Sequence, residues 1–208
     1  MDDSEGYRLT SPASRRLVTE AMDAAKRVFG THALSVDDIQ KWIDVNPFVL
    51  AVLTNSDRFA GYLDVLPLTP AGLIEVKTPT VTERDWDARH ILSPDAMQTA
   101  SDLYVASLLV VDRASSAGHE NARALFRALA GYLETLYGNQ PRHGWGLAAT
   151  ADGFRVLNRW GATKVQDGAE RSDGMTLFRF SLEPNLIREI LVKDGSKAPR
   201  VSLHLDRP

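Results

Sequence analysis

One segment of the sequence constrains the fold more than any other: an apolar stretch, a short polar linker, and an apolar stripe at helical spacing. Residues 102–112, DLYVASLLVVD, are apolar at consecutive positions, which is typical of a strand buried on both faces of a sheet. Ala122, Leu125 and Leu129 then recur at helical intervals and predict an amphipathic helix. A central strand that leads into a helix in this way indicates a fold of the α/β type.

The sequence before this segment predicts two helices. Ser11 and Pro12 resemble an N-cap followed by proline at the first helical position, and Gly30 is placed to end that helix. Ser35 and Asp38 have the spacing of a capping pair at the start of a second helix.

Strand and turn signals fill much of the remaining chain. Residues 48–54 and 58–68 flank a polar turn and predict a β-hairpin. We interpret residues 68–100, which contain the charged run TERDWDARH, as an insertion with one short helix. The other expected elements are a strand at HGWGLAA (143–149), a helix from Thr150 to Trp160 followed by Gly161, a hairpin formed by ATKVQ (162–166) and MTLFRFSL (175–182), and a helix NLIREILV (185–192) before a last extended piece. This order favours an α/β or α+β fold with a mixed sheet.

The composition excludes several classes of protein. With 208 residues, 44% of them apolar, the chain suits one domain with a sizeable core. Its net charge of −3 offers no electrostatic footprint for nucleic acid, and no apolar run approaches the roughly 20 residues that cross a bilayer. The acidic start MDDSEGYRLT does not read as a secretory signal, so we expect a cytoplasmic protein. The absence of cysteine excludes disulfides and cysteine-ligated zinc.

Four stretches together resemble the GNAT superfamily of acyl-CoA-dependent N-acyltransferases. They are AGYLDVLPL (60–68), LYVASLLVVD (103–112), SSAGHENARALFRAL (115–129) and GFRVLNRWGATKV (153–165). The resemblance implies a GNAT-like domain over residues 1–183, a C-terminal extension over 184–208, and acyl-CoA as cosubstrate.

The resemblance also implies where acyl-CoA would bind. In this family the central strand splays from its neighbour and pairs with pantetheine, and the following turn and helix N-terminus hold the pyrophosphate. Here Leu109, Val110 and Val111 would meet pantetheine. The phosphate loop would be formed by Ser116, Ala117, Gly118, His119, Glu120 and Asn121.

Two departures from the family pattern concern this site. The family loop reads Arg or Gln, two residues, Gly, one residue, then Gly or Ala, and no register of residues 115–121 fits it. Glu120 would repel phosphate at the position that the helix dipole favours. The late helix of the family often carries a Tyr that protonates the departing thiolate, and Leu157 stands at that position.

Candidate groups for acid–base chemistry lie on or near the predicted strands. Asp64, Glu75 and Asp102 are candidates for the base that deprotonates an amine, although the sequence favours a solvated charge at a strand end for each of them. Tyr104 and Ser107 would line the pocket or orient the acceptor, or else be a packed Tyr and a hydrogen-bonded Ser.

Other kinds of site find no support in the sequence. The five histidines show no metal-ligand spacing, so we expect no metal. The string GWGLAA (144–149) matches a dinucleotide fingerprint, but it reads as a strand and does not open a helix, so we reject that function.

Two functions remain open from the sequence. The first is transfer of an acyl group from acyl-CoA to an amine on a small molecule or a protein. The alternative is a non-catalytic GNAT-like module that senses acyl-CoA or binds another protein. Nucleic acid and membranes are not expected partners, and a homodimer is compatible with either function.

Overall fold

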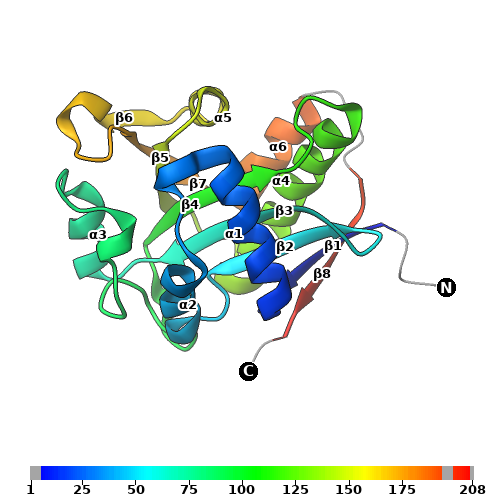
Figure 1. Cartoon of the computed structure of the whole chain (residues 1–208), viewed down its shortest axis with the longest axis horizontal. Coiled ribbons are helices and arrows are strands. Elements are labelled where there is room, and N and C mark those ends of the chain that lie inside the picture. The colour runs from blue at the N-terminus through cyan, green and yellow to red at the C-terminus, as the bar shows by residue number, and fades with distance from the viewer. Residues whose placement is uncertain (1–5, 194–198, 207–208) are drawn as a thin grey trace.

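The computed structural model describes residues 6–193 and 199–206, where an eight-stranded sheet carries helices on both faces (Figure 1). The strands are β1 (Tyr7–Ser11), β2 (Leu50–Asn55), β3 (Arg58–Pro67), β4 (Asp102–Val110), β5 (Arg142–Ala148), β6 (Thr163–Gln166), β7 (Thr176–Leu182) and β8 (Val201–Leu205). The helices are α1 (Arg15–Phe29), α2 (Val36–Val45), α3 (Pro70–Lys77), α4 (Ser116–Tyr137), α5 (Ala151–Arg159) and α6 (Pro184–Lys193). Short 3₁₀ turns are η1 (Gly30–His32), η2 (Glu83–Asp85), η3 (Met97–Thr99) and η4 (Gly168–Glu170).

The sheet is mixed, and β4 lies in its interior as predicted. The strand order is β6-β7-β5-β4-β3-β2-β1-β8. β4 pairs with β5 in parallel and with β3 in antiparallel orientation, and β1 with β8 forms the other parallel pair. The remaining neighbours are antiparallel, which includes the two predicted hairpins.

Different helices cover the two faces of the sheet. On one face α1 lies over β2 and β3 and α2 packs beside α1, and Ile39 and Trp42 of α2 join Tyr62 in a buried core (Figure 1). On the other face α4 buries Leu125 and Leu129 against the sheet, and α6 packs on α4. The sheet lies between the two cores, so a gap between its strands would connect them.

The first helix does not begin where the sequence indicated. Ser14 is its N-cap and accepts a hydrogen bond from the Leu17 N–H. Ser11 is the fully buried last residue of β1, and its hydroxyl donates to the carbonyl of Leu50 at 3.0 Å. The prediction of an N-cap at Ser11 is therefore wrong, because strand pairing takes up this serine. Gly30 ends the helix as predicted, with a φ of 59°.

Two further segments, residues 68–100 and the strand β8, complete the described fold. The stretch from 68 to 100 contains α3 and two of the 3₁₀ turns. In the segment expected as a C-terminal extension, β8 pairs with β1 from Tyr7↔Val201 to Ser11↔Leu205 and adds an edge strand. Over the described ranges, no helix combines the length and apolar character needed to cross a membrane.

Candidate acyl-transfer site

The two central parallel strands diverge soon after they pair. Within the described residues, β4 and β5 are paired only over 102–104 and 143–145. Opposite the divergence the β3–β4 register shifts, since Asp64 pairs with Ser107 but Val65 pairs with Val105. Ala106 is thus the extra residue of a β-bulge, which bends a strand locally. The second half of β4 consequently lacks β5 as a hydrogen-bonding neighbour.

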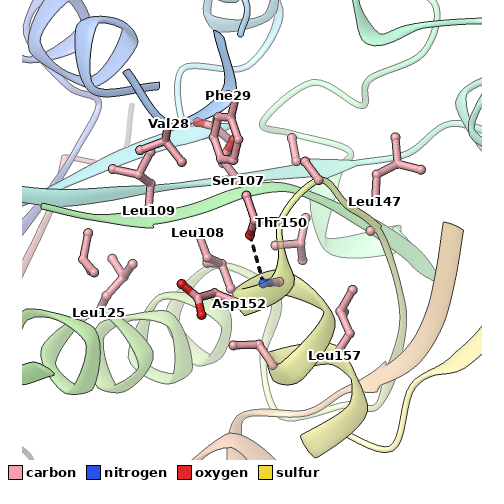
Figure 2. A pocket seen from close by; sticks show the side chains of 18 of the residues that line it. Val28, Phe29, Ser107, Leu108, Leu109, Leu125, Leu147, Thr150, Asp152 and Leu157 are labelled. Carbon is pink, nitrogen blue, oxygen red and sulfur yellow. Dashed lines mark hydrogen bonds between the residues drawn. The ribbon is translucent and has the colours of Figure 1, made fainter. Parts of the chain in front are cut away.

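A cavity of about 780 Å³ occupies this divergence. Figure 2 shows Val28, Phe29 and Leu109 on one side of β4, and Leu125 and Leu157 on the other. The cavity therefore passes through the plane of the sheet and reaches both helical layers. Its volume lies within the usual range for small-molecule and cofactor sites.

The predicted site residues fall into two groups. Those that line the cavity are Asp64, Ser107, Leu109, Val110, Gly118 and His119. Those that the structure describes outside its lining are Glu75, Asp102, Tyr104, Val111, Ser116, Ala117, Glu120 and Asn121.

The segment predicted as a phosphate loop is helical. Ser115 caps α4 by accepting the Gly118 N–H at 3.0 Å, so residues 116–121 form the first turns of the helix. The turn itself lies earlier, where Asp112 has a φ of 56° and its carbonyl accepts the Ser115 N–H. Asn121 is buried, and its Oδ1 accepts a hydrogen bond from the Tyr7 hydroxyl at 2.9 Å. The N-terminus of α4 still borders the cavity through Gly118 and His119.

Gly118 is required by the close approach of the preceding turn. A Cβ at this position would lie 2.0 Å from the Asp112 carbonyl oxygen and 2.8 Å from the Arg113 Cα. Only a residue without a side chain lets residues 112–113 fold this closely over the helix N-terminus. The glycine that the sequence pattern singled out therefore has a structural reason in this chain.

A carboxylate on α5 pairs with two arginines at the cavity wall. Asp152 Oδ2 lies 3.1 Å from Arg113 Nη1, which comes from the turn before α4, and Asp152 Oδ1 pairs with Arg155. All three residues line the cavity and are at least partly exposed. The ion pair of Arg113 and Asp152 therefore links the turn between β4 and α4 to α5, and both segments line the cavity.

Asp64 is the most deeply buried candidate base at the cavity. The residue is 2% exposed, and its Oδ1 has no hydrogen-bond partner among the described residues. Burial raises the pKa of Asp64 well above its usual range, the nearby Glu83 raises it further, and a hydrogen bond with Ser107 partly offsets this. A carboxyl group with a raised pKa at a cavity is suited to accept a proton near neutral pH.

Glu83 is a second carboxyl group at the cavity, and sequence reasoning missed it. The Tyr104 hydroxyl donates a hydrogen bond to Glu83 Oε1, and the buried ion pair of Arg171 and Asp173 lies close enough to act on it electrostatically. Burial raises the pKa of Glu83 to about 7, although the hydrogen bond from Tyr104 lowers it. Glu83 lies in a charged run between strands, and only the folded chain shows that η2 brings it to the cavity.

Asp102 and Glu75 have other surroundings. Asp102 accepts hydrogen bonds from Trp145 Nε1 at 2.8 Å and from the Ser101 hydroxyl at 2.6 Å, at the position where β4 and β5 still pair. Glu75 lies on α3 and is partly exposed. In the structure Asp102 helps to join β4 to β5 through its hydrogen bond with Trp145. The roles of Asp102 and Glu75 as candidate bases stay predictions.

The apolar side of the cavity includes the predicted Leu157. Its side chain is 7% exposed and packs in the α4 core with Trp160 and Phe180. A leucine cannot donate a proton, so any donor to a leaving thiolate must come from elsewhere. Among the described residues, no group of three or more His, Asp or Glu side chains is arranged to hold a metal ion.

Comparisons with solved structures identify the fold. The loading GNATL domain of CurA from Lyngbya majuscula superimposes with a TM-score of 0.54 at 9% identity, covering 86% of this chain and 98% of that one. YncA from Salmonella typhimurium, a putative acetyltransferase with acetyl-CoA, gives 0.52 at 11% identity over 86% and 95% of the two chains. A spermidine N-acetyltransferase SpeG chimera from Vibrio cholerae and hSSAT gives 0.51 at 8% identity over 89% and 99%. No protein-family model and no curated protein matches the sequence.

The chain thus has the fold of the GNAT acetyltransferases, as its sequence resemblance implied. At these identities the likeness concerns the fold, and function has to be argued from the chain's own site.

Proposed function

We propose that the protein transfers an acyl group from acyl-CoA to an amine. The observation that carries this proposal is the cavity at the divergence of β4 and β5, which joins a β4 edge unpaired with β5 to the buried carboxyl group of Asp64. An unpaired strand edge offers amide donors and acceptors to an extended ligand such as pantetheine.

The pantetheine arm and the phosphates of acyl-CoA each have candidate partners at the cavity. Leu109 and Val110 lie on the part of β4 that pairs with β3 but not with β5, where the pantetheine arm would run. Gly118 and His119 lie at the N-terminus of α4, whose dipole favours the phosphates. Arg113 adds a positive charge beside that terminus.

The reaction needs a base for the amine and a proton for the leaving sulfur. A neutral amine nitrogen forms the new N–C bond, the C–S bond breaks, and the thiolate takes a proton. Asp64 is the group that we assign to remove the ammonium proton, because it is buried at the cavity and its pKa is raised. Ser107 pairs with Asp64 across the β3–β4 ladder and would orient its carboxylate.

A test separates binding from turnover. Acetyl-CoA at 100 times its dissociation constant should stabilise the fold by about 2.7 kcal/mol, seen as a higher melting temperature. Release of free thiol in the presence of an amine, above the rate without amine, should then report transfer. The absence of any thermal shift with millimolar acetyl-CoA, butyryl-CoA or CoA would refute the assignment of the cavity.

A second candidate function is an acyl-CoA sensor without catalysis. Two observations favour it: Asp152 offsets one of the two positive charges of Arg113 and Arg155 at the cavity wall, and Leu157 provides no proton at the position of the family's tyrosine. Binding of acetyl-CoA without thiol release by any amine would select this alternative.

A further inference from the structure

The part of the cavity on the α1 side has an apolar wall. Met22, Ala25, Val28 and Phe29 line it from the last turns of α1. Val28 and Phe29 pack against the core under α1 but are only partly buried, so part of each large apolar side chain is exposed at the cavity (Figure 2). A ligand that covers them would remove apolar surface from water, which is favourable.

The polar groups that line the cavity include two carboxyl groups, beside the Tyr62 and Ser107 hydroxyls and His32. Asp64 and Glu83 both line the cavity, and the charge of Glu83 raises the pKa of Asp64. The Oδ1 of Asp64 has no partner among the described residues, although its side chain is almost completely buried. A buried polar atom of this kind is costly unless a ligand supplies its hydrogen bond.

This inference rests on the proposed function and narrows its substrate. We infer that the acceptor is a monoamine with an apolar aryl or alkyl body, whose ammonium group meets Asp64 and whose body covers Val28 and Phe29. One cationic nitrogen satisfies the buried acceptor atom, and the body fits the apolar wall. The ring of Phe29 also suits an aryl group, because offset aromatic contacts are favourable.

Other classes of amine fit this arrangement less well. A polyamine or a basic peptide carries several cations, and those beyond the ones that Asp64 and Glu83 pair with would lie against the apolar wall of α1. Burying an unpaired charge is strongly unfavourable. An amino acid or another acidic amine would bring a second anion towards Asp64 and Glu83. The apolar wall therefore disfavours further cations along the body of the acceptor, and the two carboxyl groups disfavour a negative charge.

The experiment measures thiol release by the full chain at saturating acetyl-CoA with a panel of amines. Hexylamine and phenethylamine represent the inferred class, and spermidine, a lysine-rich peptide and glutamate represent the others. We expect kcat/KM for the apolar monoamines to exceed that for every other amine by about tenfold or more, which corresponds to about 1.4 kcal/mol. A preference for spermidine, the peptide or glutamate overturns the inference.

A variant of the wall tests its role directly. Val28→Asp places a carboxylate on the apolar wall and should raise the ratio of spermidine to hexylamine kcat/KM by about tenfold. Val28→Asn has the same shape without the charge and serves as the matched control, and urea unfolding checks that both variants fold. Equal ratios in the two variants would contradict the assignment of the wall.

A binding measurement keeps this inference distinct from the proposed function. Calorimetric titration of phenethylamine and of spermidine into the chain without acetyl-CoA needs no turnover. Tighter binding of phenethylamine, lost in Asp64→Asn, supports the inference even if acetyl-CoA proves not to bind and the proposed function fails. Failure of phenethylamine to bind at millimolar concentration, or its binding unchanged by Asp64→Asn, overturns the inference even if acyl transfer to other amines is found.

Discussion

At the scale of single residues, Asp64 combines a function with a cost to stability. Its folded-state pKa is raised, so the ionised form destabilises the fold increasingly as the pH rises. Asp64→Asn should lower kcat by about 10²- to 10⁴-fold, the usual contribution of a general base. The same variant should be more stable than the parent at pH 8, because it removes a buried negative charge, and the gain should shrink at low pH where Asp64 is protonated. Steady-state kinetics and urea unfolding at two pH values measure both effects.

Asp102→Asn is a matched control, because Asp102 is a second buried aspartate in a central strand. Its carboxylate already accepts two hydrogen bonds, so this substitution should lower stability instead of raising it. If both variants lose stability equally at pH 8, the carboxylate of Asp64 is not the strained group that its burial indicates.

Glu83 gives a pH dependence whose direction is fixed by its surroundings. Its pKa rises from 4.5 to about 7 on folding, so its contribution to stability is complete below about 4.5 and is lost as the pH rises through 7. Glu83→Gln should therefore flatten the fall of the unfolding free energy across this window. Tyr104→Phe removes a hydrogen bond that lowers this pKa and should move the window to higher pH. Unfolding free energies measured every half pH unit check both directions, and a parent curve without a fall in this window would contradict the assignment.

At the scale of secondary-structure elements, the sequence predicts what local signals determine. The α2 cap at Ser35 and Asp38, the two hairpins and the strand at 143–149 are found in the structure because each has its own turn or cap residues. The sequence does not predict the start of α1 or the helical state of residues 116–121. Other serines lie close to Ser14 and to Ser115, and local patterns do not show which of them caps the helix. Glu83 was missed since its approach to the cavity depends on the packing of η2, which no local pattern encodes.

The close packing of residues 112–113 on the N-terminus of α4 can be tested by adding one methyl group at Gly118. Gly118→Ala places a Cβ against the backbone of residues 112–113, which must move. We expect a loss of about 1–3 kcal/mol in the unfolding free energy, as for overpacking, and at least tenfold weaker acetyl-CoA binding by calorimetry. Gly131→Ala on the same helix is the control, because its Cβ would meet only the end of the Leu203 side chain, which can rotate. If the two variants behave alike, the turn before α4 does not hold the form described.

At the scale of the whole molecule, two strands that are far apart in the sequence, β1 and β8, lie side by side at one edge of the sheet. β8 runs parallel to β1, and its partly buried Val201, Leu203 and Leu205 alternate with exposed Ser202 and His204. This alternation is that of a strand with one face on a core, and Leu203 lies against α4 at Gly131. β8 therefore packs against α4, and the N-terminus of α4 borders the cavity.

This arrangement predicts that the end of the chain contributes to the same cooperative unit as the site. Leu203→Ala should lower the unfolding free energy by about 1–2 kcal/mol, as expected for removing a partly buried leucine from a core. Ser202→Ala, one position away on the exposed face, should change it by less than about 0.5 kcal/mol. Urea unfolding followed by fluorescence and by circular dichroism should give one coincident transition for both variants, because β8 and α4 unfold together. Two separate transitions, or no difference between the variants, would show that β8 does not stabilise the helix that borders the cavity.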